Sequence, residues 1–183
     1  MEQRQTIHYD ELVEQCKRGD SSAFTALYHR HAKELYNSIY RIVGHTAEAE
    51  DLLQDSFVVA FQQIQQFEYR SHFGAWIKRI AINKAISVLR KKKVRFTETA
   101  LAHDPAAEES IDEADFALKV ADVQKAIAQL PEGYRTIVQL YLIEGIPQEE
   151  ISTLLGISYS TVRTQYHRAK ANIWKTLKQG GVS

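Results

Sequence analysis

The sequence is poor in residues that interrupt helices and in residues that cross-link chains or bind metals. It has three prolines in 183 residues and one cysteine, Cys16, which excludes an internal disulfide and any cysteine-rich metal site. His29 and His31 alone form no ligand set, so we expect no metal site and no cofactor. No apolar run approaches the ~20 residues of a membrane span, and the first residues lack the apolar segment of a signal peptide. These absences predict a cytoplasmic protein.

Charge of one sign is absent from two long segments. The chain has 23 basic and 23 acidic side chains, yet residues 97–115 hold seven acids and no base, and residues 151–183 hold no acid. The segments on either side of the acidic strip, residues 1–96 and 116–183, carry net charges of +4 and +3. Charged side chains act over about 10 Å at ordinary salt, so this distribution, and not the zero total, bears on the partners of the chain.

Apolar residues recur at helical spacing between the few breakers, and no segment resembles a pair of strands. The pattern predicts helices over residues 10–18, 21–43, 46–66, 73–92, 116–129, 133–143, 148–155 and 160–177. Asp20 or Ser21 can cap the second helix, Gly44 can end it, and Thr46 can cap the third. Residues 97–115 have too little apolar surface to fold alone. The predicted fold is all-α: two small helical domains, residues 1–96 and 116–183, joined by a flexible acidic linker.

The segment "IPQEEISTLLGISYSTVRTQYHRAK" has the spacing of a helix-turn-helix. Pro147 suits the first position of the first helix, Gly156 lies in the turn, and Ser158 can cap the second helix. At about 100° per residue, one face of the second helix is apolar; it comprises Val162, Tyr166, Ala169, Ile173 and Leu177. The opposite side is rich in donors and has no acid, which favours contact with base edges and phosphates in a major groove. Its members are Ser160, Arg163, Thr164, His167 and Arg168.

Residues 67–95 combine aromatic and basic side chains. Residues 78–95 contain eight bases and no acid, and aromatic residues alternate with polar and basic ones just before them. Aromatic side chains among cations are typical of a surface on which single-stranded bases stack. Phe73 and Ile77 are expected in the core, whereas packing does not account for a polar, aromatic loop. The candidates for DNA contact here are Tyr69, Arg70, Ser71, Trp76, Arg79 and Arg90.

The third predicted helix presents a different surface. Its inward stripe is expected to be Leu53, Phe57, Ala60, Phe61 and Ile64. On the opposite face, two apolar residues, Leu52 and Val59, lie among polar residues that include Asp51 and Asp55. Apolar residues flanked by carboxylates on an exposed face indicate a docking surface for a basic partner protein.

Together these motifs resemble an extracytoplasmic-function (group IV) sigma factor of the sigma-70 family. "AEDLLQDSFVVAF" is similar to region 2.2, which docks on the clamp helices of RNA polymerase. "FEYRSHFGAWIKRIAINKAISVLRKKK" is similar to regions 2.3 and 2.4, which melt and read the −10 element. The segment from "LPEGYRTIV" to "HRAKANI" is similar to region 4, whose helix-turn-helix binds the −35 element. The resemblance implies a non-enzymatic transcription initiation factor that directs core RNA polymerase to promoters.

The resemblance also assigns roles to particular residues. It implies polymerase docking by Asp51, Leu52 and Asp55, which agrees with the predicted docking face that also includes Val59. It implies capture of a flipped −10 base by Tyr69, Arg70 and Ser71, with Asn83 nearby, and −35 readout by Arg163, Thr164, His167 and Arg168. The implied partners are the β′ clamp and β flap of core polymerase, promoter DNA and an anti-sigma factor. Ser87, Gln165 and Tyr69 stand where the family usually has Asp, a basic residue and Gly, which implies an altered −10 preference and one weaker phosphate contact.

Two other classes of protein fit parts of the sequence. A stand-alone helix-turn-helix regulator accounts for the C-terminal third but not for the Leu52/Val59 face or the aromatic loop. An enzyme acting on nucleic acid would need clustered carboxylates for metal ions. Glu50, Asp51 and Asp55 could be proposed for that role, yet no basic or nucleophilic group is spaced to join them. We therefore expect no catalytic residue.

Overall fold

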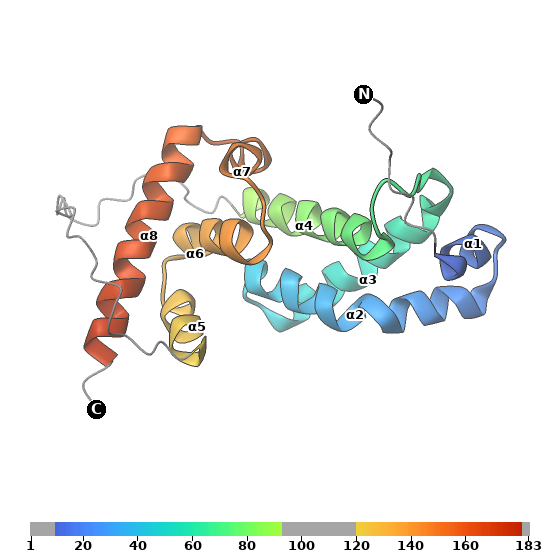
Figure 1. Cartoon of the computed structure of the whole chain (residues 1–183), viewed down its shortest axis with the longest axis horizontal. Helices are drawn as coiled ribbons and strands as arrows, with labels where there is room; N and C mark the ends of the chain where they lie inside the picture. The colour runs from blue at the N-terminus through green and yellow to red at the C-terminus, as the bar shows by residue number, and fades with distance from the viewer. Residues whose placement is uncertain (1–9, 93–119, 181–183) are drawn as a thin grey trace, which may run out of the picture. The chain divides into compact units, whose positions relative to one another are not determined.

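The structure, a computed structural model, describes residues 10–92 and 120–180 (Figure 1). All regular structure in these two ranges is helical, which confirms the all-α prediction. The chain divides into two compact units, one on each side of the Lys92–Lys93 bond. The linker expected over residues 97–115 lies outside the described residues.

The first unit is a bundle of three long helices with a short helix at one end (Figure 1). Its elements are α1 (Glu11–Lys17), α2 (Ser21–Val43), α3 (Thr46–Gln62), the 3-10 helix η1 (Ile64–Gln66) and α4 (Phe73–Lys91). Helices α2, α3 and α4 pack against one another in pairs, and α1 packs on α2 and η1. The loop of residues 67–72 connects η1 to α4 and thus lies close to α1.

Capping residues set the ends of these helices. The Asp20 carboxylate accepts a 2.8 Å hydrogen bond from the Ser22 N–H, and Gly44 ends α2 in the left-handed conformation at φ 72°, as the sequence predicts. The expected cap at Thr46 is wrong: His45 is the N-cap residue of α3 and Thr46 is its first helical residue. The third helix also ends earlier than expected, at Gln62, because the chain tightens there into η1.

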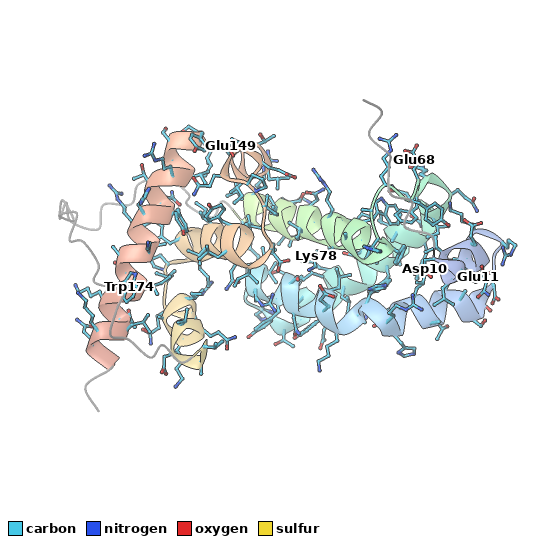
Figure 2. The ribbon with its side chains drawn as sticks, in the orientation of Figure 1. Asp10, Glu11, Glu68, Lys78, Glu149 and Trp174 are labelled. Carbon is cyan, nitrogen blue, oxygen red and sulfur yellow. The ribbon has the colours of Figure 1, made fainter. Side chains whose placement is uncertain are left out.

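The core of the first unit consists of apolar side chains from all four helices. Leu27, Ile39, Phe73, Ile77 and Leu89 are each at most 2% exposed. Burying one such side chain contributes about 1.5–3 kcal/mol, whereas an exposed ion pair contributes about 0–1 kcal/mol. Packing therefore holds the bundle together, and ion pairs add to it at the surface. One of them joins Lys78 on α4, labelled in Figure 2, to Glu34 on α2 at 2.7 Å.

The second unit is built around one long helix. Its elements are α5 (Val120–Ala128), α6 (Glu132–Val138), the π-helical turn η3 (Gln139–Ile143), α7 (Gln148–Leu155) and α8 (Tyr159–Gly180). Helix α8 packs against α5, α6 and α7. One cluster of its core comprises Ile127, Leu130, Tyr134, Val138 and Ala169.

The π turn is a departure from the expected continuous helix over residues 133–143. There the Glu144 N–H donates to the Gln139 carbonyl at 3.0 Å, five residues back, and the Ile146 N–H donates to the Leu140 carbonyl at 2.9 Å. Pro147 precedes α7 as its N-cap residue and does not take the first helical position predicted for it.

Candidate nucleic-acid and partner interfaces

Helices α7 and α8 form the helix-turn-helix that the sequence predicts. Gly156 ends α7 with φ 68°, a left-handed conformation that glycine adopts without strain. Ser158 caps the next helix, since its Oγ accepts a 3.1 Å hydrogen bond from the Thr161 N–H. Ile151 and Val162 are fully buried, so the two helices are fixed against each other by apolar packing. The turn and this seam together set the direction in which α8 presents its outer face.

The outer face of α8 carries the predicted polar side chains. Ser160, Arg163, His167 and Arg168 are exposed, and Thr164 is half-buried. On the inner face Val162, Ala169 and Leu177 are buried, as predicted. The chain has no acidic residue from residue 151 onward, so this face offers donors and positive charge only. Such a face suits a phosphate backbone and the acceptor atoms of base edges.

Two side chains of α8 explain details of the packing. Tyr166 lies edge-on to Tyr141 with ring centroids 4.9 Å apart, and burial raises the pKa of its hydroxyl, with Tyr141 adding to the shift. Gln165 is only 2% exposed. Its side chain is therefore not presented to a DNA backbone, and the weaker phosphate contact expected at this position stays a prediction.

Helix α4 carries a second set of predicted DNA contacts on one face. Taking about 100° per residue, Trp76, Arg79, Asn83 and Arg90 fall within an arc of about 60°. Arg79, Asn83 and Arg90 are exposed, and Trp76 is half-buried against Phe67, with ring centroids 5.2 Å apart.

Three lysines, two on α4 and one just after it, lie outside this arc and pair with acidic residues of other helices. Lys78 pairs with Glu34 at 2.7 Å, Lys84 with Asp55 at 3.6 Å, and Lys92, just after the helix, with Glu48 at 2.6 Å. The Lys78 ammonium also holds the pKa of the Glu34 carboxyl below its usual value. Arg79, Asn83 and Arg90 thus form an exposed face of α4 that is separate from these three lysines.

The predicted docking face of α3 requires correction. Leu52 is 7% exposed and Ser56 is fully buried, so neither lies on an exposed face. The reason is that α3 packs against both α2 and α4, which buries a wider arc than the single stripe expected. Asp51 and Asp55 are exposed as predicted, and Val59 is half-buried.

The sequence reasoning missed the apolar residue that is exposed on α3. Val58 is 52% exposed and lies within about 60° of Asp51 and of Asp55 around the helix. Its place one turn from Asp55 could have identified it. Near Asp51 and Asp55, the exposed part of α3 therefore carries one large apolar side chain, Val58.

The loop of residues 67–72 is held closely to the bundle. Arg70 is exposed and pairs with Glu68 at 2.7 Å, and Glu68 is labelled in Figure 2. Ser71 is half-buried, and so is Tyr69, whose backbone has a positive φ of 57°. The three predicted base-capture residues therefore differ in environment, with Arg70 the most accessible.

Two kinds of site are absent from the described ranges, residues 10–92 and 120–180. No group of His, Cys, Asp and Glu there could hold a metal ion. Nor does any helix in these ranges have the length and apolar character needed to cross a membrane. The geometry thus defines a helix-turn-helix DNA-binding protein with a second aromatic and basic surface in a separate unit.

Comparison with known proteins identifies this combination. Residues 27–95 match the family description "Sigma-70 region 2", and residues 121–173 match "Sigma-70, region 4". The ECF RNA polymerase sigma factor SigW of Bacillus subtilis (strain 168) is 31% identical over 177 residues, which cover 91% of this chain and 95% of that protein. The RNA polymerase sigma-H factor of Pseudomonas aeruginosa is 33% identical over 182 residues, covering 92% and 93%.

Solved structures agree on the fold. The structure of CnrH in complex with the cytosolic domain of CnrY matches with a TM-score of 0.51 and 24% identity, over 92% of this chain and 96% of that one. The sigma factor RpoE in complex with the anti-sigma factor NepR from Bartonella quintana matches with a TM-score of 0.52 and 23% identity, over 85% and 96%. The chain belongs to the ECF sigma factors of the sigma-70 family, initiation factors that direct RNA polymerase to promoters.

Proposed function

We propose that each surface described above performs one step of promoter recognition, as in a group IV member of the family. Helix α8 lies in the major groove of the −35 element and reads it through Arg163, Thr164, His167 and Arg168, with Ser160 at its start. The observation that carries this assignment is the outer face of α8, which has exposed donors and no acid. A carboxylate there would be repelled by the phosphates, and its absence leaves every side chain competent for DNA.

The first unit binds and melts the −10 element. Arg70 and Ser71 of the loop, with Tyr69 at its base, receive an unstacked base, while Trp76, Arg79, Asn83 and Arg90 on α4 contact the strand beside it. Support comes from the shared arc of the α4 residues and from the exposure of Arg70. Aromatic side chains and cations on one surface fit single-stranded DNA, because stacking and backbone charge act together.

The exposed face of α3 docks on core RNA polymerase. Asp51 and Asp55 face a basic surface of the β′ clamp, with Val59 at the edge of the contact and Leu52 supporting it from beneath. The second unit contacts the β flap, and the chain acts in the cytoplasm where the polymerase works. An anti-sigma factor is the proposed inhibitor; the structure of RpoE in complex with the anti-sigma factor NepR supports this expectation.

Transcription from a randomised promoter library tests this function. Core polymerase without a sigma factor is mixed with the chain and with templates that carry random −35 and −10 windows, and the templates of the resulting transcripts are sequenced. We expect transcripts to require the chain and to be enriched in two separate elements. Initiation that does not depend on the chain would contradict the proposal, and enrichment of a single element would contradict the role of the unit assigned to the other.

A further inference from the structure

Tyr69 has a left-handed backbone conformation that other parts of the protein must stabilise. Among the described residues it is the one non-glycine residue with a positive φ, at 57°. Side chains of L-residues rarely adopt this left-handed region, which glycine enters freely. Such a conformation persists only when the surrounding structure determines it, and outliers of this kind gather at functional sites. We therefore expect contacts of the Tyr69 side chain to hold this conformation.

Helix α1 supplies two of those contacts. The Tyr69 hydroxyl donates a hydrogen bond to the Glu14 carboxylate on α1. The Lys17 ammonium, also on α1, lies 4.4 Å from the centre of the Tyr69 ring, a cation–π contact. The Phe67 ring packs against the Tyr69 ring in an edge-to-face arrangement, with centroids 4.8 Å apart. The ring is thus held at its tip and on its face.

Lys17 also fixes the backbone on which the loop stands. Its ammonium donates to the Phe67 carbonyl at 3.0 Å and lies 3.7 Å from the Glu14 carboxylate. In return, the Gln65 amide donates to the Lys17 carbonyl at 2.7 Å. These two bonds join residues that lie 50 and 48 positions apart in the sequence. The side chain of Lys17 is only 18% exposed, so its bonds are partly shielded from water.

With its ring turned toward α1, Tyr69 does not offer a free face to a base. The residues on either side of it in the chain are exposed: the side chains of Arg70 and Glu68 are 74% and 63% exposed. Tyr69 is therefore the anchored residue of the loop, and Arg70, next to it in the chain, is the accessible one. A loop fixed in advance loses less conformational entropy when it captures a base.

We propose that α1 positions the −10 loop: Glu14 and Lys17 hold Tyr69 in its left-handed conformation, and Tyr69 anchors Arg70 and Ser71 for base capture. Tyr69, Glu14 and Lys17 are then positioning residues, and Arg70 is the residue presented to DNA. This inference rests on the proposed −10 function of the loop. It gives the short helix α1 a role in promoter melting that the polymerase and DNA surfaces do not explain.

The first test measures the loop in the free, full-length chain. Lys17→Met keeps the aliphatic stem but removes the cation and donor, and Glu14→Ala removes the acceptor. Arg18→Met is the matched control, because Arg18 follows Lys17, is 61% exposed and pairs only with Glu11 among the described contacts. NMR order parameters of the Glu68–Ser71 amides should fall from about 0.85 to below about 0.6 in the two anchor variants and stay unchanged in the control. Unchanged order in both anchor variants would overturn the inference.

The second test measures promoter melting by the holoenzyme. We expect Lys17→Met and Glu14→Ala to slow open-complex formation about tenfold, while affinity for duplex promoter and the melting temperature of the chain stay the same. Lys17→Arg restores the cation and the donor and should recover the rate. In a Tyr69→Gly background, Glu14→Ala should add no further loss, since the Glu14 carboxylate reaches the loop through the Tyr69 hydroxyl.

Arg70→Ala separates failure of the inference from failure of the function. If Arg70→Ala slows melting but Lys17→Met and Glu14→Ala do not, α1 has no positioning role and the −10 assignment stands. If Arg70→Ala melts promoters at the normal rate, the −10 assignment fails, and the positioning role fails with it even where the order parameters show the anchor. Additive losses from Tyr69→Gly and Glu14→Ala would also contradict a shared contact.

Discussion

Replacing Arg163 or Arg168 with alanine distinguishes a base contact from a phosphate contact on α8. Both side chains are exposed, and their helix has no acidic residue. Substitutions of this kind at a surface usually change the free energy of unfolding by less than about 0.5 kcal/mol. A larger change in DNA binding would therefore belong to the DNA contact and not to the fold.

The two kinds of contact predict different magnitudes and patterns. Loss of a bidentate base contact costs about 1–3 kcal/mol, or about 5- to 150-fold in affinity, at one base position only. Loss of a phosphate contact weakens binding to all sequences alike and lowers the slope of log affinity against log salt by about 0.9. We expect at least one of the two variants to relax base preference, because Thr164 and His167 lie beside the arginines on the same donor face.

Sequencing of holoenzyme-bound DNA from a randomised −35 library, done at more than one salt concentration, measures both the base preference and the salt dependence of binding. Lys178→Ala is the matched control, since Lys178 is exposed and lies about 22 Å further along α8 than Arg163. Val162→Asp marks loss of the fold, because it places an unpaired charge at a fully buried position. If neither arginine variant alters the base preference, α8 does not read sequence through its arginines.

Three further outcomes are expected. Asp55→Arg should weaken core polymerase binding by about 2 kcal/mol at an unchanged melting temperature; an unchanged affinity, measured by fluorescence titration, would remove Asp55 from the interface. Burial lowers the pKa of His31; Arg30 adds to the shift, and Glu34 and Asp10 oppose it. Between this lowered pKa and about pH 6.5, His31 therefore binds fewer protons in the folded chain than in the unfolded one. Stability should thus be full above about pH 6.5 and fall as the pH drops through the folded pKa, and denaturant melts of His31→Gln should show less of this loss. Burial raises the pKa of Cys16 to about 11, so its thiol should react with iodoacetamide at pH 8 only after unfolding, and rapid labelling of the native chain would contradict its burial.

Local signals in the sequence were sufficient for the helix-turn-helix of the second unit. The Gly156 turn, the Ser158 cap and the apolar stripe of α8 depend on residues close together in the chain, and all are found in the structure. The π turn at Gln139–Ile143 was not predictable, because a 3.6-residue periodicity does not register hydrogen bonds to the fifth residue back. The burial of Gln165 was missed for a similar reason: a polar residue gives no hydrophobic signal.

In the first unit the errors come from tertiary contacts. One apolar stripe predicts one packed face, and it placed Leu52 outside; the structure buries Leu52 because α3 has two neighbours. The left-handed Tyr69 was equally hidden, since tyrosine is not a turn residue and its partners Glu14 and Lys17 lie about fifty positions away. Sequence reasoning found the loop but not the contacts that hold it.

Equilibrium binding of the fluorescently labelled, full-length chain to core RNA polymerase, without DNA, tests the central claim most directly. A sigma factor binds the polymerase before it meets a promoter, whereas a stand-alone helix-turn-helix regulator binds DNA alone. We predict saturable binding with one chain per core enzyme, weakened by Asp55→Arg and unaffected by Arg163→Ala. A chain that binds promoter DNA specifically but shows no saturable binding to core polymerase would contradict the account.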